Sequence, residues 1–350
     1  MTILIFIAVL FVTVVVHEWG HFIVAKKSGM LVEEFGFGLP PRLIGWKRGE
    51  TVYSLNALPI GGFVKIAGES SEATAAPKER QFATKPWYTK SAVLIAGVLC
   101  NLLLGFFLFV VADMVGLPGV TPHGIPTVIE VVSGSPTATA GISVGDTVAS
   151  VAVGDAAVPV IDTDHLRAAI AHASGQSVVI TYVHQGVVAR ATLSPVATED
   201  GPMIGIAVES IGTIKESFVH ALGIAWGQSL NAVKAVVGAL ALLIEGLFRG
   251  HPSTQNLVGP VGIAKEIGSA AQFGFTYVLA FAASISLNLA VLNIFPFPAL
   301  DGGRLMVVWG EAITHRKFSP TVVGMVHAAG FLLLIGLMVA LTISDIKRTL

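Results

Sequence analysis

The stretch His17-Glu18-Trp19-Gly20-His21 lies inside the first long apolar run of the chain, residues 2–25. On a helix, residues four apart leave the same face one turn apart, so both imidazoles would point the same way. This spacing suits two nitrogen ligands of one zinc ion, with a carboxylate beside them to take a proton from bound water. The alternatives are coincidence, or buried histidines bonded to neighbouring helices. Because three ionisable groups inside a spanning helix are costly, the metal site is favoured.

The composition is typical of a multi-pass membrane protein. Of the 350 residues, 53% are hydrophobic and only 12% are charged, and the mean hydropathy is +0.78. Apolar runs long enough to cross a bilayer lie at 2–25, 91–112, 275–300 and 320–343. The first run has no basic segment ahead of it and carries the metal motif, so we do not expect a cleaved signal peptide. A single cysteine, Cys100, rules out a disulfide within the chain.

The basic residues are unevenly distributed along the chain. Ten Lys and Arg residues lie between positions 26 and 90, whereas residues 119–215 contain three against eight acids. The positive-inside rule therefore predicts a cytoplasmic first loop, with the N-terminus and residues 119–215 outside. The metal motif would then lie roughly 7–14 Å from the cytoplasmic end of its helix, at 1.5 Å per residue.

The first loop contains three apolar stretches punctuated by glycine and proline, at 34–38, 51–55 and 61–66. This pattern predicts short strands joined by turns. The stretches are too apolar for a solvated hairpin, which favours a sheet that dips into the membrane against the helices. Irregular backbone at that depth persists only where protein buries it. A small cytoplasmic hairpin is the alternative.

Residues 119–208 have the texture of a soluble domain. Strands are predicted at 127–132, 146–151, 178–183 and 187–193, and a short helix at 162–172. At about 90 residues, this segment is one small β-rich domain.

Residues 217–249 are apolar enough to suggest a fifth span, but Gln228, Asn231, Lys234 and Glu245 interrupt them. A lysine in mid-span is expensive, so an amphipathic helix at the membrane interface is preferred. If Asp301 is a third ligand, its span must run in the same direction as residues 2–25, which leaves no room for a single extra crossing. We therefore predict four spans.

The third apolar run ends in Asn293-Ile294-Phe295-Pro296-Phe297-Pro298-Ala299-Leu300-Asp301-Gly302-Gly303. The two prolines break the helix and expose backbone groups that need a buried partner or water. A carboxylate beside such a break suits a metal ligand, although Asp301 could equally be a helix-end residue facing the cytoplasm. Asn101 either bonds neighbouring helices together or faces the site. His251 and His327 are interpreted as structural.

Together these residues resemble the site-2 protease family of intramembrane zinc metalloproteases, and in particular its bacterial RseP-type members. The resemblance is carried by the motif at 17–21 and by the Asn-x-x-Pro-x-Pro-x-Leu-Asp-Gly pattern at 293–302, with support from 36–38, 59–65, 259–264 and Asn288. It implies that His17, His21 and Asp301 hold Zn²⁺ and that Glu18 is the general base. Candidate substrate-binding residues are Gly61, Gly62, Phe63, Asn101, Asn288 and Asn293.

The resemblance also implies that residues 119–208 are a PDZ domain on the outer face, since the turn at 141–146 resembles a PDZ signature. It makes residues 34–66 a membrane-associated β-structure that holds substrate as an added strand. Two departures stand out. Residues 97–101 lack the proline of the Gly-Pro-x-x-Asn pattern that the family often has, and the length allows one PDZ domain where some members carry two.

The predicted fold class is a polytopic α-helical membrane protein with four transmembrane helices, a membrane-associated β-hairpin region and one small extracytoplasmic PDZ-like domain. The predicted segments are the first transmembrane helix, 1–26; a cytoplasmic or re-entrant β-region and loop, 27–90; the second transmembrane helix, 91–113; the PDZ-like domain, 119–209; the amphipathic interfacial helix, 212–250; a connection, 251–274; the third transmembrane helix, 275–302; and the fourth, 319–344.

The expected function is that of an intramembrane zinc endopeptidase of the cell (inner) membrane. Its substrates would be transmembrane segments of membrane proteins, such as anti-sigma factors or remnant signal peptides, trimmed first by another protease. The N-terminus and PDZ-like domain would be extracytoplasmic and the active site toward the cytoplasm. The lipid bilayer is an expected partner and nucleic acid is not.

Two functions from other classes compete with this one. A non-catalytic scaffold could bind exported protein tails through the PDZ-like domain, but the intact Glu18 argues against it. A transporter could use the broken helix at a midplane ion site. The lack of an internal repeat and the extramembrane domain argue against the transporter.

Overall fold

The computed structural model describes residues 2–69, 75–154, 156–160, 163–173, 176–184, 186–198, 201–249 and 258–349. His251 lies outside these residues. The chain divides into two compact units, one formed by Met1–Met114 with Ser217–Leu350 and the other by Val115–Glu216.

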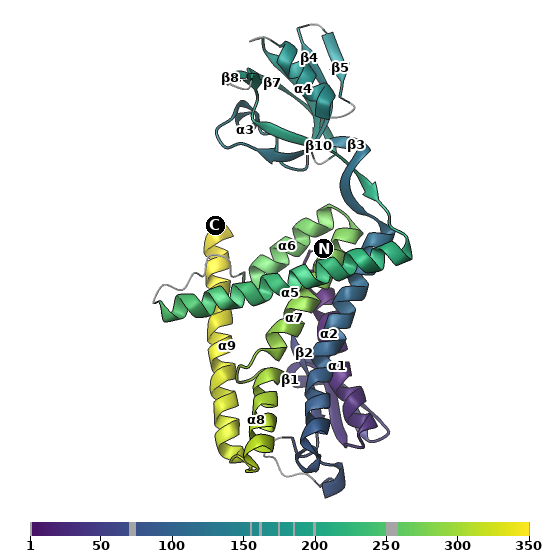
Figure 1. Ribbon diagram of the computed structural model, residues 1–350, viewed down its shortest axis with the longest axis vertical. Helices are drawn as coiled ribbons and strands as arrows, with labels where there is room; N and C mark the ends of the chain where they lie inside the picture. Colours follow the sequence, from purple (N-terminus) through teal and green to yellow (C-terminus); the bar gives the residue numbers. More distant parts are fainter. Residues whose placement is uncertain are drawn as a thin grey trace. The chain divides into compact units, whose positions relative to one another are not determined.

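The first unit is mainly helical, with a hairpin and two short turns of 3-10 helix between its first two helices (Figure 1). Its elements are α1 (Thr2–Lys27), β1 (Val32–Arg48), β2 (Thr51–Ile66), η1 (Lys78–Arg80), η2 (Phe82–Thr84), α2 (Trp87–Val115), α5 (Phe218–Phe248), α6 (Pro260–Gln272), α7 (Phe275–Ile294), α8 (Asp301–Thr314) and α9 (Pro320–Thr349).

Five helices of the described chain, namely α1, α2, α5, α7 and α9, are long and apolar enough to cross a membrane. Four of them lie at the predicted spans, and α5 covers the segment predicted to lie at the interface. Figure 1 shows α5 running across α2 and α7 instead of alongside them. Ala221 and Ala225 of α5 pack against α2 and α7, whereas none of the most apolar window of α5 is buried. The four-span count remains a prediction.

The hairpin folds into a small sheet that lies against α1. Residues 34–37 of β1 pair with 52–55 on one side and with 62–65 on the other, and 44–48 pair with 51–55. The order is therefore 44–48, 51–55, 34–37 and 62–65. Aromatic rings of the sheet contact rings of α1. The ring centroids of Phe37 and Phe11 are 4.6 Å apart, and those of Phe35 and Phe22 are 5.5 Å apart. The sheet thus packs along the apolar part of α1.

The third predicted span, 275–302, is not one continuous helix. α7 ends at Ile294, and α8 begins at Asp301. Pro296 and Pro298 lack the N–H groups that a continuing helix would need. Gly302 lets α8 start close under α7, because a Cβ there would lie 2.2 Å from the carbonyl oxygen of Ile294. Asp301 is therefore the first residue of a new helix and not the last of the third span.

The described residues of the second unit form a β-rich domain with two short helices. Its elements are β3 (Leu117–Val131), α3 (Pro136–Thr139), β4 (Thr147–Val153), β5 (Ala156–Pro159), α4 (Thr163–His172), β6 (Val178–His184), β7 (Val187–Leu193), β8 (Val196–Thr198), β9 (Gly201–Met203) and β10 (Ile206–Ile214). The main sheet has the order β10-β3-β4-β6-β7, and β5 pairs with β4. Leu166 and Ile170 of α4 join the buried core. The four predicted strands are confirmed, as is the predicted helix over Thr163–His172, residue 162 lying outside the described residues. The elements α3, β5, β8, β9 and β10 were not predicted.

Candidate active site

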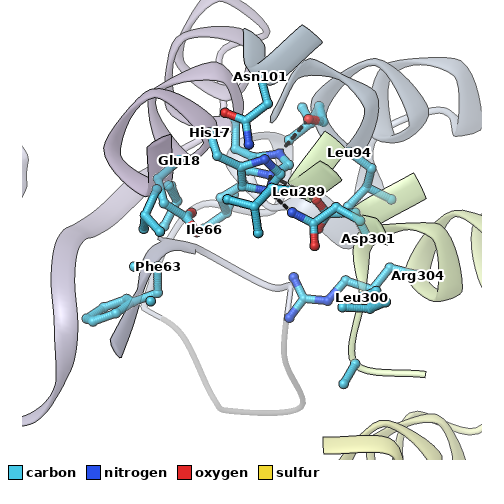
Figure 2. Close-up of a pocket in the computed structure, with 18 of the residues that line it drawn as sticks. His17, Glu18, Phe63, Ile66, Leu94, Asn101, Leu289, Leu300, Asp301 and Arg304 are labelled. Atoms are coloured by element: carbon cyan, nitrogen blue, oxygen red, sulfur yellow. Dashed lines mark hydrogen bonds and ion pairs between the residues drawn. The ribbon is translucent and has the colours of Figure 1, made fainter. Parts of the chain in front are cut away.

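Three side chains from two elements converge at one point in the first unit (Figure 2). His17 and His21 both lie on the buried face of α1, as their spacing predicts. The Oδ2 atom of Asp301 is 3.1 Å from the Nε2 atom of each histidine, and the two Nε2 atoms are 3.1 Å apart. We call these three residues the metal cluster, because their ligand atoms all lie within 4.8 Å of one another.

The donor set of the metal cluster fits zinc. Two imidazole nitrogens and one carboxylate oxygen are zinc ligands, and three protein ligands leave a fourth position for water. The Nδ1 atom of His21 lies 2.8 Å from the carbonyl oxygen of Val93. When Nδ1 carries the proton, its N–H donates a hydrogen bond to this carbonyl, and the lone pair of Nε2 is directed at the cluster.

Two glycines let α1 and α2 approach closely beside the cluster. A Cβ on Gly20 would lie 2.5 Å from the carbonyl oxygen of Ala96. A Cβ on Gly97 would lie 2.3 Å from Nε2 of His21 and 2.8 Å from Cε1 of His17. Residue 97 therefore has no room for a side chain unless the two histidine rings move. Gly97 was noted in the sequence as part of a family pattern, but its contact with His17 and His21 was not predicted.

The cluster opens into a cavity of about 370 Å³ that Glu18 also lines. Residues 62–65, which form one edge of the small sheet, pass close to this carboxylate, because a Cβ on Gly62 would lie 2.9 Å from Cγ of Glu18. Of the candidate substrate-binding residues, the cavity is lined by Gly61, Gly62, Phe63, Asn101 and Asn293. Asn288 is absent from the described lining. The Nδ2 atom of Asn293 lies 3.4 Å from Nε2 of His17.

Asn101 is completely buried, and its side chain lines the cavity. Neither its side-chain nitrogen nor its side-chain oxygen has a hydrogen-bond partner among the described residues. Its backbone carbonyl accepts a hydrogen bond of 2.8 Å from Ser286 of α7. The backbone of Asn101 thus joins two helices, while its amide group remains available to the cavity.

Glu69 and Arg304 complete the cavity wall and were not predicted as site residues. The Arg304 guanidinium donates a hydrogen bond of 2.6 Å to Oε1 of Glu69, which ties the end of the hairpin region to α8. Burial raises the pKa of the Glu69 carboxyl, and the charge of Arg304 opposes that rise. Arg304 lies three residues after Asp301 on the same helix, so its spacing was the one available signal.

The profile of peptidase family M50 matches residues 5–337 of the chain. The chain belongs to peptidase family M50. This M50 peptidase is 33% identical to a protein of Clostridium acetobutylicum named as a candidate zinc metalloprotease, over 96% of this chain and 94% of that one. It is 29% identical to the zinc metalloprotease RasP of Shouchella clausii, over 99% of both chains.

One of the solved structures that match the M50 peptidase covers part of this chain. It is the PDZ domain of an SdrC-like protein from Listeria monocytogenes, with 24% identity over 26% of this chain and 92% of that chain, and a TM-score of 0.22. A likeness this low carries no argument about the fold, so the PDZ character of Val115–Glu216 remains a proposal.

Family M50 is the site-2 protease family, so the resemblance seen in the sequence is confirmed. The M50 peptidase is a zinc metalloendopeptidase with Zn²⁺ as its cofactor. Its family and its apolar helices make it a multi-pass membrane protein that acts as an intramembrane protease on membrane proteins. The scaffold and transporter alternatives are therefore not supported.

Proposed function

We propose that this M50 peptidase cleaves transmembrane segments such as those of anti-sigma factors or remnant signal peptides. His17, His21 and Asp301 hold the zinc ion, and Glu18 is the general base. The observation that carries the proposal is the convergence of three ligand atoms at 3.1 Å in a cavity that Glu18 also lines.

The chain supplies the groups that hydrolysis of a peptide bond requires. Zinc, when bound, offers a water with a pKa of about 7 and polarises the scissile carbonyl. Glu18 would accept a proton from the attacking water as its oxygen bonds to the scissile carbon, and would pass that proton to the amine nitrogen as the C–N bond breaks. Asn101 and Asn293 present amide groups to the cavity, and these amides stabilise the charge that develops on the carbonyl oxygen.

The edge strand 62–65 is the proposed holder of the substrate. A helical segment hides its carbonyls in i→i−4 bonds, so the substrate must be extended to be cut. In the described chain, the register of 62–65 gives it backbone partners on one side only, from 34–37. The substrate adds to the other side as a strand through main-chain hydrogen bonds. Because residue 62 is a glycine, the strand passes close to Glu18.

The proposed orientation in the cell (inner) membrane follows from the distribution of Lys and Arg. The N-terminus and Val115–Glu216 are extracytoplasmic, and the metal cluster lies toward the cytoplasm. α5 rests at the membrane interface, so that four helices span. Its course across α2 and α7 (Figure 1) supports this arrangement, because a spanning helix would lie alongside its neighbours.

The PDZ-like unit is proposed to screen substrates by the size of their extracytoplasmic part. A bulky outer domain is then excluded until another protease has trimmed it. The alternative is that the unit recruits newly exposed C-termini. Exclusion is favoured because no clear carboxylate-binding glycine loop stands out in the sequence. The one weak candidate is Gly124-Ile125-Pro126.

Substitution of Glu18 tests the assignment of roles. Glu18→Gln keeps all three ligands, so it should retain zinc while proteolysis falls by about 100-fold or more, as expected for the loss of a general base. His17→Ala is the matched comparison and should lose both zinc and proteolysis. The measurements are the zinc content of the purified protein and the cleavage rate of a transmembrane peptide. Cleavage by Glu18→Gln at the wild-type rate would reject the general-base role.

A further inference from the structure

α9 contacts the rest of the described chain along one narrow stripe. Only 6% of its most apolar window is buried. Between Pro320 and Ala340, the residues that are buried or half-buried recur every three or four positions, at Val323, His327, Gly330, Leu334 and Met338, and those between them are exposed. This spacing marks a single helix face, so the stripe identifies the side chains of α9 that face protein.

The stripe meets the break between α7 and α8 at two neighbouring positions. The backbone N–H of Ala299 donates a hydrogen bond of 2.9 Å to Nδ1 of His327. One turn further along, a Cβ on Gly330 would lie 2.5 Å from Cβ of Pro298 and 2.6 Å from its carbonyl oxygen. The absence of a side chain at Gly330 thus lets α9 come close enough for His327 to reach Ala299.

Ala299, which donates this hydrogen bond, has an uncommon backbone conformation. Its φ is 79°, in the left-handed region that residues other than glycine seldom adopt. The backbone hydrogen bonds described within the break are donated by other residues, such as the N–H of Leu300, which donates to the carbonyl of Phe297 at 3.2 Å. An amide without a partner at membrane depth is costly. His327 therefore holds this turn from outside.

We propose that His327 is a positioning residue that keeps Asp301 in its place in the metal cluster. It acts through Ala299, which lies two residues before Asp301, and it contacts neither the cluster nor the substrate. This inference rests on the proposed function, in which Asp301 is a zinc ligand. It gives α9 a role in the site, where the sequence suggested only a structural histidine.

Three substitutions separate the hydrogen bond from simple packing. His327→Leu removes the acceptor but keeps an apolar side chain of similar size. His327→Asn places a carbonyl oxygen near the position of Nδ1 and can accept the same N–H, whereas His327→Gln places its oxygen one bond further out. Leu332→Ala is the control, because Leu332 is 69% exposed on the same helix.

The measurements use the full-length protein purified in detergent. Zinc affinity is obtained by competition with a chelator, and kcat and KM are obtained with a transmembrane peptide. His327→Leu and His327→Gln should weaken zinc by about tenfold, as losses of outer partners do. They should lower kcat with little change in KM. His327→Asn should recover most of both quantities, and Leu332→Ala should match wild type. The rise in unfolding temperature on adding zinc should follow the same order.

Two results would overturn the inference. One is wild-type zinc affinity and kcat in His327→Leu. The other is equal losses in the Asn and Gln variants, which would show that the accepted hydrogen bond does not matter. Asp301→Asn identifies which claim has failed. If Asp301→Asn also keeps zinc, the ligand assignment is wrong, whereas if it loses zinc while His327→Leu keeps it, only the role of His327 is wrong.

Discussion

His17 and His21 of the metal cluster both lie within one uninterrupted helix, α1. Asp301, in contrast, is the first residue of α8 and follows the break after α7. The two histidines need only helical periodicity and a close neighbour to take their positions. Asp301 needs a turn of defined shape, held by contacts from other elements. The two halves of the cluster are therefore sensitive to different kinds of substitution.

The contacts around each half show the same difference. Beside the histidines, two glycines, Gly20 and Gly97, fit α1 to α2. Around Asp301, a Cβ on Gly303 would lie 2.2 Å from the carbonyl oxygen of Phe297, and α9 supplies the bond to Ala299. We expect a single substitution beside the histidines to cause a large loss of zinc affinity, because the close packing leaves no room for a side chain. A substitution around the break should cause a smaller loss, because several separate contacts hold that turn.

The largest effect is expected from Gly97→Ala. Its Cβ would lie 2.3 Å from Nε2 of His21, the atom that we propose as a zinc ligand, so the His21 ring could not keep its position. The His21 ring is also held by Val93, so it cannot move aside without losing that bond. Zinc affinity should fall by at least about 100-fold, beyond the range expected for outer partners, and proteolysis should be lost. Equilibrium dialysis against buffered zinc measures the affinity.

Gly238→Ala is the matched control for Gly97→Ala. It makes the same change in α5, where a Cβ would have no heavy atom within 4 Å. It should leave zinc affinity unchanged and should slightly stabilise its helix, because alanine favours a helix over glycine. Wild-type zinc affinity in Gly97→Ala would mean that α1 and α2 can move apart at little cost, and that the histidine half of the cluster is not rigid.

Asp301→Asn should have the next largest effect. The amide keeps the shape of the side chain but removes its charge and one of its acceptor oxygens. Zinc affinity should fall well over tenfold, given that the loss of an outer partner alone costs 10–100-fold. Chelator competition on purified protein checks this.

Asp113→Asn provides the comparison for Asp301→Asn. Asp113 is also a buried carboxylate, but it lies on α2 and accepts a hydrogen bond of 3.2 Å from Gln228. The substitution Asp113→Asn should leave zinc affinity unchanged. If Asp301→Asn likewise left zinc unchanged, Asp301 would be a helix-end residue, as the sequence allowed.

These differences also explain what could be predicted from the sequence. The HExxH spacing and the apolar runs are local patterns, and they located α1 and both histidines. The prolines indicated a break, but no local pattern shows that the chain restarts as a helix at Asp301. The link between His327 and Ala299 joins residues 28 positions apart, and that between Glu69 and Arg304 joins residues 235 positions apart. Such contacts depend on the packed fold, so periodicity does not reveal them.

The course of α5 was harder to predict for a compositional reason. Its mean hydropathy over the best window is 1.5, compared with 2.7 for α2. A value between those of a soluble helix and a membrane span fits both positions. Lys234 favoured the interface, as did the requirement that the span before Asp301 run in the same direction as residues 2–25. Length and composition alone admit α5 as a fifth span.

The smallest effect is expected at Glu50, on the turn between β1 and β2. Its carboxylate accepts hydrogen bonds from Lys26 at the end of α1, at 2.6 Å, and from Arg80, at 2.8 Å. Arg80 and then Lys26 lower the pKa of Glu50 to about 2. A lowered pKa stabilises the fold above the ordinary value of 4.5, and this stabilisation is lost as the pH falls toward 2.

Glu50→Gln should therefore lower the unfolding temperature at about pH 7, and only by about 2 °C or less, because exposed ion pairs contribute little. The gap from wild type should narrow at about pH 3. Glu245→Gln, which affects one exposed pair with Arg249 on α5, should show a smaller change. Thermal unfolding in detergent measures all three proteins. Zinc affinity should stay at the wild-type value in Glu50→Gln, since helical spacing and α2 place the histidines. A tenfold loss of zinc there would show that the hairpin also positions them, and the contrast between the two halves would disappear.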